Sequence, residues 1–80
     1  MELSDIRAKI DAVDDQLLSL FLQRMDLAEE VAAYKNEHHL PILNKQRERA
    51  VLAKVTERAG ARERYAYHLF STLFALARSR

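Results

Sequence analysis

Residues 5–36 read DIRAKIDAVDDQLLSLFLQRMDLAEEVAAYKN, and this stretch decides the fold of the chain. Its apolar residues recur at spacings of three, four or seven, which places them on one face of an α-helix: Ile6, Ile10, Val13, Leu17, Leu20, Leu27 and Val31. No Gly or Pro interrupts it, Ser4 is the expected N-cap, and the helix dipole favours Asp5 in the first turn. We therefore predict one helix from about Asp5 to about Asn36.

The apolar stripe on this helix is wider than a two-stranded coiled coil requires, because five further residues flank it: Leu3, Leu18, Phe21, Ala28 and Ala32. At 1.5 Å per residue the helix is roughly 48 Å long, whereas a compact globule of this size has a diameter of roughly 30 Å. The helix must extend beyond its own domain, and so wide an apolar face predicts association. A homodimer with two long helices packed antiparallel or steeply crossed satisfies this requirement.

Two shorter helices follow the linker that contains Pro41. Asn44 is the expected N-cap of the second helix and Gly60 its end, with an inner face made of Val51, Leu52, Val55 and Ala59. The third extends from about Arg62 to Arg80 and carries Tyr65, Ala66, Leu69, Phe70, Leu73, Leu76 and Ala77. The predicted fold is all-α, a three-helix protomer of a homodimer, with a single domain over residues 1–80.

The composition of the 80-residue chain narrows the class of protein. With 49% hydrophobic residues, one Gly and one Pro, it is too apolar for disorder and too poor in turn residues for a β-sandwich or barrel. It has no Cys, which excludes a disulfide, a thiolate nucleophile and a Cys-based zinc site. Its charge of +1, the absence of signal-peptide features and the lack of an apolar run near ~20 residues lead us to expect a cytoplasmic protein that binds neither nucleic acid nor membrane.

Two cations on the first helix are candidates for a binding site. Arg24 occupies a seam position where a bundle requires Leu or Ile, so its guanidinium must be paired, hydrated or bound to an anion. An anion site is one alternative. The others are an ion pair with Asp14, Asp26, Glu29 or an acid of a partner chain, and an Arg that extends its guanidinium into solvent. Lys35 lies three turns further, so both cations project the same way about 16 Å apart. Alternatively, Lys35 is a solvated residue at the helix C-terminus.

Three further charged residues are candidates. Arg47 and Glu48 lie one turn before the apolar face of the second helix, at its edge, and a solvated first turn is the alternative. Arg7 is about 25 Å from Arg24 along the helix, too far for both to bind one small ligand within one chain. In an antiparallel or crossed dimer it can complete the partner's site. Otherwise it is an exposed residue paired with Asp11.

No residue pattern indicates metal or covalent chemistry. His38 and His39 are adjacent and lack a third ligand at a recognisable spacing, and there is no Gly-rich phosphate loop or Gly-flanked nucleophile. What remains is a set of cations and one carboxylate on apolar helix faces. Such a set suits an anionic substrate whose reaction needs orientation and electrostatic stabilisation, with no metal and no cofactor.

Six segments together form a familiar pattern: residues 6–14 (IRAKIDAVD), Leu17-Leu18, Arg24, Lys35, Pro41-Ile42 and Arg47-Glu48-Arg49. They resemble the all-helical chorismate mutase family, which occurs alone or fused to prephenate dehydratase or dehydrogenase, and the resemblance covers nearly the whole chain. It implies an intertwined three-helix homodimer. It also implies an isomerase that converts chorismate to prephenate by a Claisen rearrangement, without a cofactor or covalent intermediate.

The resemblance implies a role for each charged residue. Arg24 and Arg47 look like the residues that hold the substrate carboxylates, and Arg7 looks like the Arg that the other subunit donates. Lys35 resembles the Lys that hydrogen-bonds a carboxylate and the ether oxygen, where negative charge grows as the C–O bond breaks. Glu48 resembles the acid that accepts a hydrogen bond from the ring hydroxyl.

The chain departs from the family pattern at two places. Asn44 stands where family members often carry an Asp near the ring hydroxyl. Ala77 falls at a third-helix Ser position, and the Gln or Glu four residues on, which hydrogen-bonds the ether oxygen, falls one residue beyond Arg80. Three alternatives stay open: the chain continues past Arg80, Ser79 or Arg80 substitutes, or activity is weak.

Two other functions also stay open. An isochorismate pyruvate lyase could use the same scaffold, since the same cations would hold either substrate. A helical dimerisation or regulatory module could retain the pocket without turnover. A nucleic-acid-binding helical dimer is disfavoured by the near-neutral charge.

Overall fold

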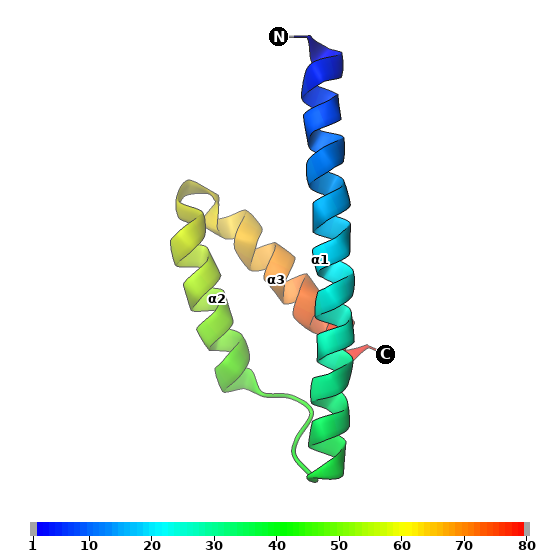
Figure 1. Cartoon of the computed structure of the whole chain (residues 1–80). Coiled ribbons are helices and arrows are strands. Elements are labelled where there is room, and N and C mark those ends of the chain that lie inside the picture. The colour runs from blue at the N-terminus through cyan, green and yellow to red at the C-terminus, as the bar shows by residue number, and fades with distance from the viewer. Residues whose placement is uncertain (1, 80) are drawn as a thin grey trace. The chain divides into compact units, whose positions relative to one another are not determined.

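The chain folds into helices (Figure 1). The computed structural model describes residues 2–79 and contains α1 over Leu3–Glu37, α2 over Lys45–Ala59, a 3₁₀ turn η1 over Gly60–Arg62, and α3 over Glu63–Arg78. Residues 2–79 contain no β-strand. The predicted all-α class and its long N-terminal helix are therefore confirmed, and the helix boundaries lie within two residues of those predicted. The intertwined homodimer and the single domain remain predictions.

Contacts within the chain define two structural units, residues up to 31 and residues from 32 onward, and each is described by itself. The first unit is the N-terminal part of α1, and all its described residues are exposed or half-buried. The second unit contains the end of α1, the linker, α2 and α3. Over residues 2–79, no helix is long and apolar enough to cross a membrane.

The first turn of α1 begins earlier than predicted. The backbone N–H groups of Asp5 and Ile6 donate to the carbonyl oxygen of Glu2, at 3.0 and 3.2 Å. The helix therefore begins at Leu3, and the prediction that Ser4 is its N-cap is wrong. Leu3 is a good helix former and extends the first turn, so Ser4 takes a place inside the helix, where it costs little.

At its C-terminal end, α1 closes with a Schellman motif. The N–H of Leu40 donates to the carbonyl of Lys35 at 2.8 Å, and the N–H of His39 donates to the carbonyl of Asn36 at 3.3 Å. These two bonds define the motif and satisfy carbonyls that the helix end leaves without partners. His39 adopts a φ of 58°, in the left-handed region that usually favours glycine. The motif turns the chain out of α1 into the linker toward α2.

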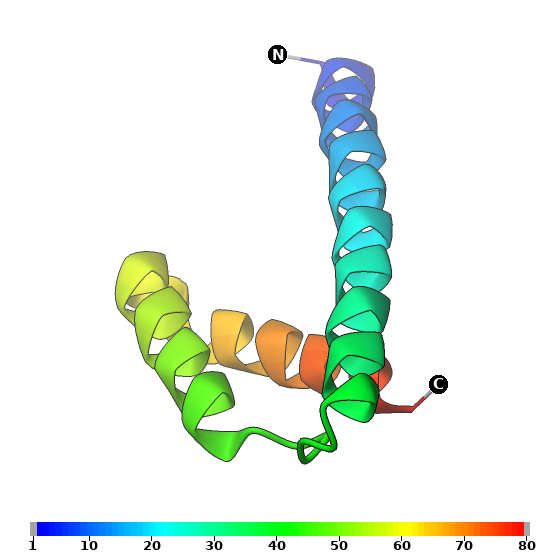
Figure 2. The same ribbon diagram turned by 60° about the horizontal axis from the view of Figure 1, so that its bottom comes forward.

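A helical hairpin is formed by α2 and α3, which pack against each other and meet at the turn that contains Gly60 (Figure 2). Gly60 has a φ of 59°, and its N–H donates to the carbonyl of Glu57. No heavy atom lies within 4 Å of the place where its Cβ would stand, so backbone conformation and not space requires glycine here. The prediction that Gly60 ends the second helix is confirmed.

The inner faces of the hairpin form its small core. On α2 they comprise the four predicted residues, all half-buried: Val51, Leu52, Val55 and Ala59. On α3, Phe74 is 8% exposed, and it is flanked by half-buried Ala66, Phe70, Leu73 and Ala77. Three other residues of the predicted apolar pattern, Tyr65, Leu69 and Leu76, are exposed in the single chain. α3 is apolar on two adjacent faces, and spacing alone does not indicate which of them α2 covers.

We predict that His39→Gly stabilises the chain. His39 holds a left-handed conformation that glycine adopts at little cost, so the free energy of unfolding should rise by about 1 kcal/mol. Urea unfolding followed by circular dichroism, at one fixed chain concentration, measures the change. The matched control is His38→Gly, one residue earlier, which should lower stability. A His39→Gly chain that is no more stable than the parent would contradict the assignment of strain to this residue.

Candidate active site

The first turn of α2 and its N-cap hold three of the predicted site residues in a fixed arrangement. The side-chain Oδ1 of Asn44 accepts a hydrogen bond from the backbone N–H of Arg47 at 3.0 Å. The backbone N–H of Glu48 donates to the carbonyl of Asn44 at 3.1 Å. The prediction that Asn44 caps the second helix is confirmed, and this cap sets where the side chains of Arg47 and Glu48 leave the helix.

The carboxylate of Glu48 has a cationic partner from the other helix of the hairpin. Arg78, in the last turn of α3, donates from Nη1 to Oε2 of Glu48. The Glu48 side chain is 25% exposed and the Arg78 side chain 39% exposed, so a ligand can reach both. Ala77, the half-buried residue at the family's Ser position, directly precedes Arg78. The ion pair therefore joins Glu48 and the end of α3 in one place.

Sequence reasoning did not identify Arg78. Its partner is 30 positions away, and their contact depends on how the hairpin closes, which no local pattern records. The available signal was weak: Arg78 is a basic residue in the last turn of a helix, where the dipole alone favours a cation. The sequence position of Arg78 alone cannot distinguish this interaction with the helix dipole from an ion pair.

Lys35 is half-buried in the last turn of α1. Its ammonium Nζ donates to the carbonyl oxygen of Ile42 in the linker, at 2.9 Å. The carbonyl of Lys35 takes part in the Schellman motif described above. Backbone and side chain of this residue are thus both tied to the linker that leads to Asn44. An ammonium has three N–H donors, so this bond leaves two for a ligand.

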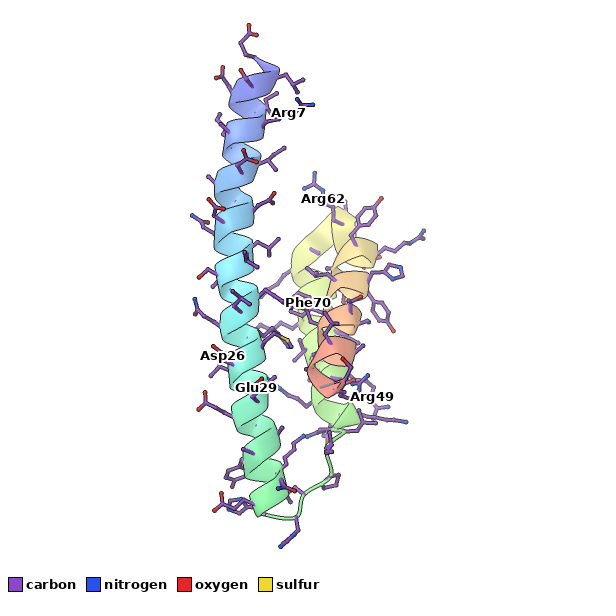
Figure 3. All side chains as sticks on the ribbon, turned by 90° about the vertical axis from the view of Figure 1, so that its right-hand side faces the viewer. Arg7, Asp26, Glu29, Arg49, Arg62 and Phe70 are labelled. Atoms are coloured by element: carbon purple, nitrogen blue, oxygen red, sulfur yellow. The ribbon has the colours of Figure 1, made fainter. Side chains whose placement is uncertain are left out.

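Arg7 and Arg24 belong to the first unit, and the structure does not test their predicted meeting with the residues of the second unit. Arg7 is exposed near the N-terminal end of α1 (Figure 3). Arg24 is half-buried, as are Phe21, Met25 and Ala28 nearby on α1. Their predicted roles therefore stay predictions.

The two linker histidines have local roles. The ring of His38 stacks on the ring of Tyr34, with centroids 4.0 Å apart, and its Nδ1 lies 2.9 Å from the carbonyl oxygen of Tyr34. His39 occupies the left-handed position of the Schellman motif. Within residues 2–79, no cluster of His, Asp and Glu has the arrangement of a metal site.

Chemically, the second unit presents donors and one acceptor around the linker and the first turn of α2. Lys35 and Arg47 carry the positive charge that suits carboxylates, and an Arg can bind a carboxylate through two parallel hydrogen bonds. Glu48 can accept a hydrogen bond from a hydroxyl group. This set fits a small carboxylated ligand that also carries a hydroxyl group.

Comparison with known proteins agrees with this chemistry. Residues 6–80 match the family described as chorismate mutase type II, and the chain belongs to that family. The chain is 42% identical over 50 residues to the T-protein of Haemophilus influenzae. It is 37% identical over 54 residues to the chorismate mutase of Methanocaldococcus jannaschii. It is also 40% identical over 42 residues to the 4-amino-4-deoxychorismate mutase of Streptomyces venezuelae.

The chain corresponds to only part of each of these relatives. The matched segments cover 62%, 68% and 52% of this chain, in the order given above. They cover 13% of the T-protein, 54% of the chorismate mutase and 41% of the 4-amino-4-deoxychorismate mutase. No solved structure gives a significant match to the chain.

We predict that Asn44→Ala lowers the free energy of unfolding by about 1 kcal/mol, because the N–H of Arg47 loses its side-chain acceptor. Asn44→Asp should keep the cap, since a carboxylate accepts the same hydrogen bond and suits the helix N-terminus. Urea unfolding of the three chains at equal concentration measures both effects. The cap would not be what orders this turn if Asn44→Ala kept the free energy of unfolding of the parent and Asn44→Asp lowered it.

Proposed function

We propose that the chain is a chorismate mutase, an isomerase that converts chorismate to prephenate. The observation that carries the proposal is the family match over residues 6–80. The capped turn of Arg47 and Glu48 and the half-buried Lys35 support it, because they supply charges that complement a dicarboxylate with a ring hydroxyl. The rearrangement proceeds within one molecule, so the protein needs to orient the substrate and stabilise charge.

In the proposed site, Arg24 and Arg47 bind the two carboxylates and hold the flexible enolpyruvyl arm over the ring. Such orientation raises the rate because the reacting atoms no longer have to find each other. Lys35 donates to the ether oxygen, where negative charge develops as the C–O bond breaks. Loss of a comparable preorganised donor costs about 2.7 to 4 kcal/mol of activation free energy. Glu48 accepts the hydrogen bond of the ring hydroxyl.

A homodimer completes the proposed site. Leu17, Leu20 and Leu27 on α1 are 54%, 61% and 59% exposed, although their spacing puts them on one apolar face. Covering such a face with a second copy of the chain is strongly favourable, at about 25 cal/mol per Å² of apolar surface. In an antiparallel or crossed pair of α1 helices, Arg7 of one chain reaches the site of the other.

A second candidate substrate is 4-amino-4-deoxychorismate, which the Streptomyces venezuelae relative favours through its name. As that name states, an amino group replaces the oxygen substituent at ring position 4. The same carboxylate-binding residues would hold either molecule. The substituent on the ring is what separates the two, and Glu48 is the residue proposed to meet it.

The activity is tested with the purified chain and chorismate. We expect prephenate to form far faster than in the uncatalysed reaction, without added metal or cofactor and equally well with a chelator present. Lys35→Ala should lower kcat/KM by about 10² to 10³-fold, while the exposed Lys54→Ala, on α2, should leave it unchanged. Absence of turnover would overturn the proposal in favour of a binding module, and pyruvate release from isochorismate would indicate a lyase.

A further inference from the structure

We propose that Arg78 is a specificity-determining residue of this site, which makes the site select a hydroxyl group over an amino group at ring position 4. The inference rests on the proposed function, since it concerns the substituent that Glu48 meets. It goes further by assigning a role to a residue on α3 that the family pattern does not name.

The first step is the contact itself. Nη1 of Arg78 donates to Oε2 of Glu48, so the carboxylate carries its counter-ion on one side. The pair joins the first turn of α2 to the last turn of α3, the two open ends of the hairpin. Glu48 is held at its backbone by the Asn44 carbonyl and at its side chain by Arg78. Both the backbone and the carboxylate of Glu48 therefore have a hydrogen-bond partner within the hairpin and its cap.

The second step concerns the capacity that remains for a ligand. An ionised carboxylate has about four lone-pair sites, and the bond from Arg78 uses one of them. A substrate hydroxyl can still donate to this group. The 25% exposure of the Glu48 side chain leaves it accessible, and the guanidinium of Arg78, 39% exposed, stands next to it. A ligand that meets Glu48 therefore also meets the charge of Arg78.

The third step concerns charge. A lone carboxylate attracts an alkylammonium group more strongly than it attracts a neutral hydroxyl, because Coulomb attraction adds to the hydrogen bond. An alkyl amine is largely protonated at neutral pH. Paired with Arg78, the carboxylate contributes no net charge, and the guanidinium repels an ammonium placed beside it. The guanidinium of Arg78 has little effect on the binding of a neutral hydroxyl. The ion pair therefore discriminates by repelling the amino substrate.

A role in stability alone would give a different outcome. If the ion pair only braced α2 against α3, its loss would lower kcat/KM for both substrates alike. This common loss should be small, because an ion pair between partly exposed side chains contributes little to folding. The ratio of kcat/KM for the two substrates cancels such a common loss. This ratio is therefore the quantity that separates selection from bracing.

The test compares chorismate with 4-amino-4-deoxychorismate in four proteins: the parent chain, Arg78→Gln, Arg78→Lys and Arg64→Gln. The parent should prefer chorismate, and Arg78→Gln should shift the kcat/KM ratio toward the amino substrate by about tenfold or more. Arg78→Lys keeps a cation beside Glu48 and should restore the parent ratio. Arg64→Gln removes an exposed arginine at the other end of α3 and should leave the activity and the ratio unchanged.

A parent chain that prefers the amino substrate would overturn the inference, as would a ratio that Arg78→Gln leaves unchanged or that Arg78→Lys fails to restore. Inactivity of the parent chain on both substrates would instead overturn the proposed function, and the inference with it. Where Arg78→Gln does not fold, Glu48→Gln provides the second arm. It keeps an acceptor oxygen but leaves Arg78 without its counter-ion, so preference for chorismate should increase, and an unchanged ratio would overturn the inference.

Discussion

The apolar face of α1 is the constraint on which the rest of the molecule depends. At 35 residues the helix is long, and its Leu and Val side chains remain exposed in the single chain. A helix gains most of its stability in water from the burial of its apolar face against a partner. The chain places that face on α1 and gives α2 and α3 a small core of their own around Phe74. A second copy is the partner that we propose for it, and the active site follows from that pairing.

Local bonds of the second unit then determine where the site residues stand. The Schellman motif turns the chain at His39, Lys35 reaches the linker carbonyl of Ile42, and Asn44 begins α2. Each bond spans few residues, so the segment from the end of α1 to the first turn of α2 is ordered without a large core. The ion pair of Arg78 with Glu48, in contrast, joins residues 30 positions apart in the chain. This division explains why the cap at Asn44 could be predicted, while the partner of Glu48 was missed.

The helices and their ends could largely be predicted from the sequence, because caps and periodicity are local properties. Asn44 and Gly60 were placed correctly on that basis. Ser4 was not, since the helix begins two residues earlier than predicted, at the helix former Leu3. The apolar pattern of the third helix omitted Phe74, which is 8% exposed, because α3 is apolar on two faces and the choice between them belongs to packing with α2. Packing across the hairpin is a non-local property, and periodicity carries no record of it.

The most direct test of a site built from two chains is complementation between two inactive variants. Arg7→Ala and Arg24→Ala chains are assayed alone and after mixing in equal amounts, with chain exchange followed by native mass spectrometry. In the mixed dimer one site has both arginines and the other has neither, so we expect each variant alone to be inactive and the mixture to recover about a quarter of the parent activity. No recovery despite complete chain exchange would contradict the shared site.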